Sequence, residues 1–204
     1  MNSVEYALNK MNREVGDRDT LKKVYRTAAD GIDGEILWDV RGRDTAWSKV
    51  LPGILCGERH FLRIRCMKGL RRTLESLKNE GYILAVATSK PEEYAKRIAD
   101  KFDFAKYFAG IYGATMDGSL IRKADVIRYA LDSLGVEREN YDQVVMVGDR
   151  NNDIYGAKEN GIQVIGVLYG YGDLAELQSA GADYIAKMPE EITQIIRKCD
   201  HERV

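Results

Sequence analysis

The chain has 204 residues, of which 45% are hydrophobic and 31% are charged. This length allows one ordinary core, or one core with a small additional module. The 31 Lys and Arg residues nearly balance the 32 Asp and Glu residues, so no net field favours nucleic acid or an anionic membrane surface as a partner. No apolar run approaches the roughly 20 residues of a membrane-spanning helix, and no signal pattern opens the chain. We therefore expect a cytoplasmic protein, and the sequence leaves its oligomeric state open.

The first third of the chain predicts little regular structure after its first helix. Residues 1 to about 22 predict an amphipathic helix, with Val4, Leu8 and Met11 on one face. The segment from Val24 to Gly69 has no sustained period of 3.6 or 2.0 residues and holds isolated tryptophans among charged residues. We therefore divide the chain into an irregular region, 1–69, and a regular region, 70–204.

The regular region alternates amphipathic helices with short apolar runs, which is typical of a parallel sheet with crossover helices. The sequence predicts an α/β fold with at least four βα units. Predicted helices cover Leu70–Asn79, Pro91 to about Phe102, Lys123–Leu134, Asp153–Asn160, Leu174–Ser179 and Pro189–Lys198. Predicted strands cover Tyr82–Ala87, Phe108–Tyr112, Gln143–Val147, Gln163–Leu168 and, at the edge, Ala182–Ala186.

Two aspartates follow the third of these strands, in the segment GDRNND. Asp149 and Asp153 are four residues apart across a strand-to-helix turn, and ligands bind at the carboxyl edge of open α/β sheets. Both carboxylates can therefore point at one hard cation such as Mg²⁺, which binds a few carboxylates together with water and substrate phosphate. The alternative is that Asp153 only caps the following helix, a common role for this residue.

Two further signals concern phosphate. Thr88 and Ser89 follow the first predicted strand, just before a helix that Pro91 opens, and hydroxyls with free N–H groups at a helix start can bind phosphate. Alternatively, Ser89 is only the cap of that helix. Lys123 begins a later helix, where it can neutralise phosphate charge or lie solvated on the surface.

A hydroxyl after one strand, a lysine at a helix start and GDxxxD after a later strand resemble motifs two to four of the haloacid dehalogenase superfamily. The resemblance covers about residues 70–191 and includes the phrases "VATSKPEEYAKRI", "KADVIRYAL" and "GAKENGIQVIGVLYGYG", which are similar to the phosphoglycolate-phosphatase-like branch. It implies a Rossmann-like core with strand order 5-4-1-2-3 and a helical cap.

The resemblance also implies roles for five residues. Thr88, Ser89 and Lys123 would bind the phosphoryl group, and Lys123 would also neutralise the charge of the nucleophile. Asp149 would bind Mg²⁺, and Asp153 would complete the metal site directly or through water. The substrate would be a small phosphomonoester.

The family's first motif, a strand ending in DxDGT, has no match. Its first Asp is the nucleophile and its second works as acid and base. The pair Asp30 and Asp33 has the wrong spacing and follows no apolar strand. Residues 2–8 resemble the first cap helix, which normally comes about ten residues after DxDGT. We therefore expect the chain to begin just after its catalytic strand, which is the central strand of the sheet.

A shifted reading frame explains the irregular segment. Dropping one base from codons that can encode Val24 to Val40 gives FIGPPLMESMEKFYGM, which resembles the family's cap, although synonymous codons were chosen to obtain it. We infer three single-base insertions, near Val24, Phe61 and Gly69. On this interpretation the chain derives from an intact phosphatase and is itself a poor catalyst. One alternative is that the chain is a catalytically dead phosphate-binding or regulatory module. Another is that the parent enzyme is 5′-nucleotidase-like.

Overall fold

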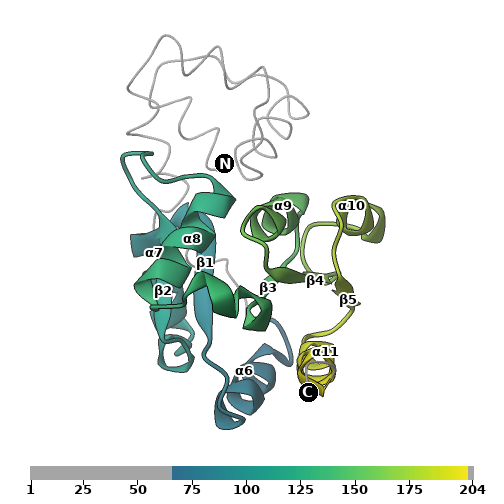
Figure 1. Cartoon of the computed structure of the whole chain (residues 1–204). Helices are drawn as coiled ribbons and strands as arrows, with labels where there is room; N and C mark the ends of the chain where they lie inside the picture. The colour runs from purple at the N-terminus through teal and green to yellow at the C-terminus, as the bar shows by residue number, and fades with distance from the viewer. Residues whose placement is uncertain (1–65, 202–204) are drawn as a thin grey trace, which may run out of the picture. The chain divides into compact units, whose positions relative to one another are not determined.

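The computed structural model describes residues 66–201 (Figure 1). The internal contacts of the chain divide it into two units, residues 1–65 and residues 66–204. The helix predicted over residues 1–22, the pair Asp30 and Asp33, and nearly all of the segment from Val24 to Gly69 lie outside the described residues. The predicted boundary at residue 69 stays a prediction.

The described part alternates helices and strands, as an α/β fold requires. Its helices are α6 (Leu70–Asn79), α7 (Glu92–Lys101), α8 (Lys123–Ser133), α9 (Asn151–Glu159), α10 (Leu174–Ser179) and α11 (Pro189–His201). Its strands are β1 (Ala85–Pro91), β2 (Gly110–Ala114), β3 (Val145–Gly148), β4 (Gln163–Val167) and β5 (Tyr184–Ala186). Short 3-10 helices, Ala105–Tyr107 and Arg138–Gln143, precede β2 and β3. The predicted fold class is confirmed.

The strands form two hydrogen-bonded groups, and every pairing is parallel. β1 pairs with β2, and β3, β4 and β5 pair in that order. Figure 1 shows the two groups, with β1 and β2 drawn in blue and teal and β3 to β5 in green and yellow. Within residues 66–201 no hydrogen-bonded pairing joins β1 to β3. The predicted loss of a central strand between them stays a prediction.

Helix bounds agree with the sequence more closely than strand bounds do. Helices α6 and α10 have the predicted bounds, whereas the predicted strand Tyr82–Ala87 is shifted and β1 covers Ala85–Pro91. The reason is that β1 has one partner, and its ladder extends only along β2, from Ala85 opposite Gly110 to Pro91 opposite Ala114. None of the helices in the described part is both long and apolar enough to cross a membrane.

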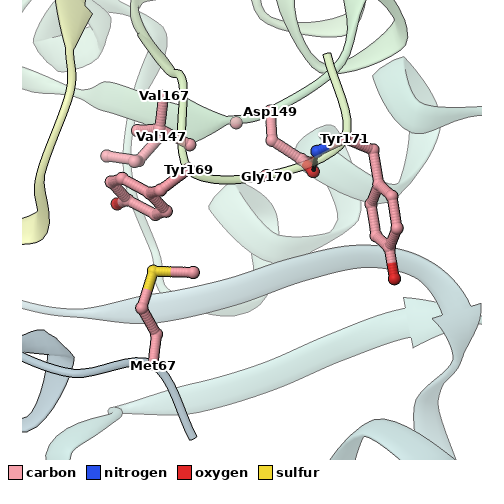
Figure 2. Close-up of a pocket in the computed structure, with 8 residues that line it drawn as sticks. Met67, Val147, Asp149, Val167, Tyr169, Gly170 and Tyr171 are labelled. Atoms are coloured by element: carbon pink, nitrogen blue, oxygen red, sulfur yellow. Dashed lines mark hydrogen bonds between the residues drawn. The ribbon is translucent and has the colours of Figure 1, made fainter. Parts of the chain in front are cut away.

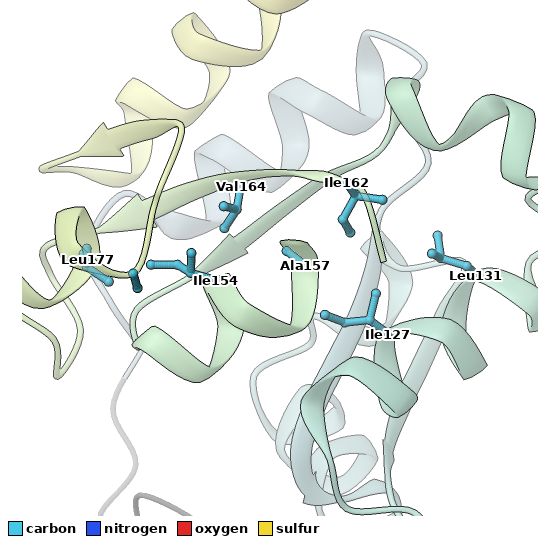
Figure 3. Close-up of a cluster of buried hydrophobic side chains, with 8 residues drawn as sticks. Ile127, Leu131, Ile154, Ala157, Ile162, Val164 and Leu177 are labelled. Atoms are coloured by element: carbon cyan, nitrogen blue, oxygen red, sulfur yellow. The ribbon is translucent and has the colours of Figure 1, made fainter. Parts of the chain in front are cut away.

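Apolar clusters cover both faces of the strand layer. One cluster joins α8, α9, β4 and α10 through Ile127, Ile154, Val164 and Leu177, which point toward one another in Figure 3. A second joins α6, β4, β5 and α11 through residues that include Leu77, and a third gathers around Phe104 and Tyr107 beside α6, α7 and β2. These clusters give the described unit its core, since apolar burial is the main favourable term in folding.

We predict that Leu177→Ala destabilises the fold more than Leu174→Ala does, although both residues belong to α10. Leu177 is 0% exposed and Leu174 is 44% exposed, so only the first substitution leaves a cavity in the core. The free energy of unfolding should fall by about 2–5 kcal/mol for Leu177→Ala and by much less for the control. Urea denaturation followed by circular dichroism measures both, and equal losses would contradict the described packing.

Candidate functional site

Lys123 joins three elements, β1, α8 and α9. It is the first residue of α8, and its side chain is 12% exposed. Its Nζ lies 2.7 Å from Oδ1 of Asp153 on α9 and donates a hydrogen bond of 3.2 Å to the carbonyl oxygen of Ala87 in β1. The alternative that Lys123 is a solvated surface residue is therefore wrong.

A glycine in α9 allows this approach. A Cβ at Gly156 would lie 2.7 Å from Cγ of Lys123 and 3.0 Å from the backbone nitrogen of Ala124. Both distances are shorter than ordinary van der Waals contact, so a larger residue would push α9 away from the start of α8. Gly156 therefore leaves the space that the Lys123 side chain needs to reach Asp153.

Asp153 holds the turn between β3 and α9. Its Oδ2 accepts hydrogen bonds from the backbone N–H groups of Asp149, over 3.1 Å, and Arg150, over 3.2 Å. Arg150 is the N-cap of α9, so Asp153 does cap this helix, as the alternative interpretation states. Its Oδ1 contacts Lys123. Asp153 thus couples the turn to the lysine, and its role as a metal ligand stays a prediction.

The loop after β4 holds Asp149 from the other side. The Tyr171 N–H donates to Asp149 Oδ2 over 2.8 Å (Figure 2). The Gly172 N–H donates to the Asp149 carbonyl oxygen over 2.9 Å. A Cβ at Gly170 would overlap the Asp149 carboxylate, which explains why a glycine is needed there. Asp149 Oδ1 has no hydrogen-bond partner among residues 66–201, and it can accept a ligand.

Glu176 fastens the same turn to α10, and the sequence did not predict this role. Its Oε1 accepts from Arg150 Nε over 2.8 Å and from the Asn151 N–H over 2.9 Å. The spacing from Asp173 to Glu176 indicates a local capping box, and Asp173 does accept from the Glu176 N–H over 2.8 Å. The carboxylate of Glu176 instead reaches back 25 residues, which a local pattern cannot reveal.

The charge of Glu176 depends on these contacts. Burial opposes ionisation, but the hydrogen bonds from Arg150 and Asn151 lower the pKa of Glu176 below its ordinary value of 4.5. A carboxylate whose pKa is lower in the folded state stabilises that state above the ordinary pKa and loses the effect as pH falls through the lowered pKa. The turn that carries Asp149 is therefore held in its described form at neutral pH.

Thr88 and Ser89 lie at the end of β1, directly after the Ala87 carbonyl that binds Lys123. Thr88 Oγ1 accepts from the Lys90 N–H over 3.2 Å, and Ser89 is exposed. The N-cap position of α7 is Pro91, with no side-chain cap, so the alternative that Ser89 caps this helix is wrong. Both hydroxyls thus belong to the two residues that follow Ala87, whose carbonyl oxygen binds Lys123.

A cavity of about 500 Å³ opens beside Asp149. Figure 2 shows Val147, Val167 and Tyr169 on one side and Met67 opposite them. Burial, together with the negative charges of Asp149 and Glu190, raises the pKa of Tyr169 to about 12, so its phenol is neutral at physiological pH. The cavity therefore has apolar walls, and the carboxylate of Asp149 lies at its edge.

The two carboxylates that the sequence predicts as metal ligands belong to Asp149, directly after β3, and to Asp153, in the first turn of α9. No group of three Asp, Glu, His or Cys side chains suited to a metal gathers within residues 66–201. Mg²⁺ is often held by one or two protein carboxylates with water and substrate phosphate, so this donor set fits Mg²⁺ better than it fits a metal that needs three or four protein ligands. Asp149 is the better candidate, because both oxygens of Asp153 already have partners.

The chain is similar to several known proteins. The chain is 43% identical over 115 residues to a 5′-nucleotidase from Pseudomonas aeruginosa, covering 56% of this chain and 51% of the relative. It is 30% identical over 121 residues to a phosphoglycolate phosphatase from Haemophilus influenzae, covering 59% and 53%. The chain thus spans about half the length of these curated relatives. Among solved structures, a predicted phosphatase from Clostridium acetobutylicum superposes with a TM-score of 0.76 at 33% identity, covering 96% of this chain and 89% of that one.

The family model for haloacid dehalogenase-like hydrolases matches residues 49–167, which is more than half of the chain. The match includes β1, α8, β3 and α9, the elements that bring Lys123, Asp149 and Asp153 together. The resemblance seen in the sequence is thereby confirmed. The chain belongs to the haloacid dehalogenase-like hydrolase family.

Proposed function

We propose that the intact form of this protein is a Mg²⁺-dependent phosphatase for a small phosphomonoester, and that the chain as written has little or no turnover. The observation that carries the proposal is the position of Lys123 Nζ, between the Asp153 carboxylate and the Ala87 carbonyl. This contact supports the proposal because it links β1, which carries Thr88 and Ser89, to Lys123 and to α9, which carries Asp153. Family membership supports phosphoryl transfer as the class of reaction.

Each residue of the site has a task in this proposal. Ser89, with Thr88, hydrogen-bonds the phosphoryl oxygens, and Lys123 neutralises their charge, because fixed positive groups at such a centre stabilise the charge that develops in the transition state. Asp149 is the main Mg²⁺ ligand, and Asp153 orients Lys123 and the turn. When bound, Mg²⁺ would offset negative charge on the transferring group.

The group that is missing from this arrangement is the nucleophile. In the family an aspartate attacks phosphorus and forms an aspartyl-phosphate intermediate. None of the five described strands, β1 to β5, ends in DxDGT. Asp149 is held by the Tyr171 N–H as part of the proposed metal site. Positioning and a metal cannot replace the group that forms the covalent bond, so we infer that turnover is lost.

Two other functions have specific support. The 43% identity to a 5′-nucleotidase favours a nucleoside monophosphate over phosphoglycolate as the parent's substrate. A catalytically dead phosphate-binding module would keep Ser89, Lys123 and Asp149 for recognition. Saturable phosphate binding without turnover would favour the phosphate-binding module. A non-functional product of a damaged reading frame would show neither phosphate binding nor turnover.

We predict that the DNA immediately upstream of Met1 encodes, in some frame, an apolar strand ending in DxDGT. We also predict that the segment from Val24 to Gly69 becomes cap-like once three single-base insertions are corrected. Resequencing the gene with roughly 60 upstream bases tests both expectations. An upstream region without the motif in any frame would exclude this origin for the chain.

We predict that purified chain of the present sequence releases no phosphate above background in the presence of Mg²⁺, because it lacks the covalent nucleophile. Phosphoglycolate, a nucleoside 5′-monophosphate and p-nitrophenyl phosphate are the substrates, and heat-treated protein is the control. Metal-dependent release that Asp149→Asn abolishes would show that another residue acts as the nucleophile.

In a chain restored by adding the strand and correcting the frame, we predict that Asp149→Asn and Lys123→Ala each lower kcat/KM about a hundredfold or more. The first weakens binding of the Mg²⁺ that offsets phosphoryl charge, and the second removes a positive charge from the site. Asp142→Asn, an exposed aspartate, and Lys158→Ala, whose lysine pairs with Asp183 away from the site, are the matched controls and should keep activity. Near-full turnover in either site variant would show that its residue is misplaced in the proposal.

A further inference from the structure

A second cavity lies at the carboxyl end of β2. It measures about 430 Å³, and its lining includes Met116 and Leu120 from the turn after β2, Tyr129 from α8, and Glu92 and Glu93 from the start of α7. Cavities that bind small organic ligands measure about 300–1,000 Å³. The cavity is therefore large enough for such a ligand.

This cavity is close to the residues proposed to bind phosphate. β1 and β2 run parallel, with Thr88 opposite Gly113 and Pro91 opposite Ala114, and Gly113 also lines the cavity. Neighbouring strands lie about 4.8 Å apart, so Thr88 is about one strand spacing from the cavity lining. A ligand with its phosphate at Thr88 and Ser89 can therefore extend its other end into the cavity.

An aromatic ring forms one wall of the cavity. Tyr129 is 40% exposed, and its ring centroid lies 5.3 Å from that of Tyr112, with the two ring planes at 84°. This edge-to-face contact orients the Tyr129 ring and leaves part of it open to a flat ligand. Met116, which is 50% exposed, adds an adaptable apolar contact. The wall is therefore suited to stacking against a heteroaromatic base.

The turn that carries Met116 and Leu120 is held by its own hydrogen bonds. The Thr115 N–H donates to the Leu120 carbonyl oxygen over 2.9 Å, and the Leu120 N–H donates to Thr115 Oγ1 over 3.0 Å. Within the turn, Asp117 Oδ1 accepts from the Ser119 N–H over 3.0 Å. A ligand therefore spends little of its binding free energy on ordering this wall.

The two glutamates of the cavity differ in how they are held. Glu92 Oε2 accepts from the Gly113 N–H over 3.2 Å, and Glu92 Oε1 lies 2.6 Å from Lys96 Nζ. Glu93 is exposed and has no hydrogen-bond or ion-pair partner within the described part of the chain. Its carboxylate can accept hydrogen bonds from a ligand, and it repels a ligand that brings a second negative group.

The spacing between the phosphate residues and the aromatic wall fits a nucleotide. Lys123 and Tyr129 are six positions apart in α8, which corresponds to about 9 Å along the helix axis at about 1.5 Å per residue. In a nucleoside 5′-monophosphate the ribose separates the phosphate from the base, so the molecule spans such a distance. Phosphoglycolate has only a short carboxymethyl group beyond its phosphate and does not.

We propose that this cavity binds the base of a nucleoside 5′-monophosphate, with the ring against Tyr129 and an amino group of the base donating to Glu93. The position of the phosphate rests on the proposed function, because it uses Thr88 and Ser89, whereas binding of the base does not depend on catalysis. Guanine, which has adjacent N–H donors on one edge, matches the two oxygens of a carboxylate. Glu93 disfavours phosphoglycolate, which would bring a second carboxylate to the cavity.

Binding of nucleotides to the full 204-residue chain tests the proposal. Isothermal titration calorimetry with Mg²⁺ compares GMP with IMP, which is the same nucleotide without the amino group, and with phosphoglycolate and inorganic phosphate. GMP should bind about tenfold or more tightly than IMP or phosphate, because it adds a hydrogen bond to a charged group. Phosphoglycolate should bind no more tightly than phosphate. Equal affinities for GMP and IMP, or for GMP and phosphate, would overturn the proposal.

Substitutions in the chain locate the site. Glu93→Gln should weaken GMP binding about tenfold, because it removes the charge of the acceptor, and Glu139→Gln, at an exposed glutamate before β3, is the matched control. Tyr129→Ala should weaken GMP binding about tenfold, and Tyr129→Phe, which keeps the ring, should restore it. Tyr155→Ala, at a residue 54% exposed on α9, is the control for the loss of a tyrosine. Unchanged GMP affinity in both Glu93→Gln and Tyr129→Ala would contradict the site.

Guanosine and inorganic phosphate separate this proposal from the catalytic one. Guanosine has no phosphate, so its binding should weaken in Glu93→Gln and stay unchanged in Ser89→Ala, whereas binding of inorganic phosphate should show the reverse. If only the guanosine result is obtained, the base site stands and the proposed phosphate site fails. If only the phosphate result is obtained, the base site fails and the proposed function stands.

Discussion

The ion pair between Lys123 and Asp153 is the interaction on which the described site depends. Both side chains are nearly buried, and their charged atoms are 2.7 Å apart. Removing one partner of such a pair leaves an uncompensated charge and typically costs about 3–5 kcal/mol. Because Lys123 also binds the Ala87 carbonyl and Asp153 also binds two N–H groups of the next turn, the pair links β1, α8 and α9 at one edge of the layer.

Around this pair the backbone is arranged so that Asp149 has little freedom. Tyr171 and Gly172 donate to it from the loop after β4, and Glu176 holds the adjacent Arg150 and Asn151 from α10. These partners use one carboxylate oxygen of Asp149 and leave the other available. A ligand that binds there meets a group already in place, so little of the binding energy is spent on ordering the turn.

The sequence predicted the helices, and it failed where structure depends on contacts between residues distant in the chain. The helix α6 was predictable because its apolar period stops at Gly81, whose φ of 92° suits glycine. The rule for strand ends predicts that Ser89 and Asp149 lie at one edge of the sheet, and the structure shows contacts of Lys123 with Asp153 and with the Ala87 carbonyl. The start of β1 was missed because it depends on pairing with β2, and the role of Glu176 was missed because its partners lie 25 residues away.

The break in the strand layer sets a further constraint on the molecule. The two apolar clusters include Met146 and Val145 of β3, Ala87 of β1 and Leu84 just before it, so the two groups of strands share core packing although no ladder joins them in the described unit. Near the unpaired strands, Val147 and Ile83 are 36% and 79% exposed. Unpaired apolar edges of this kind are templates for added strands. Within the described unit, the unpaired edges of β1 and β3 are therefore where association between copies would begin.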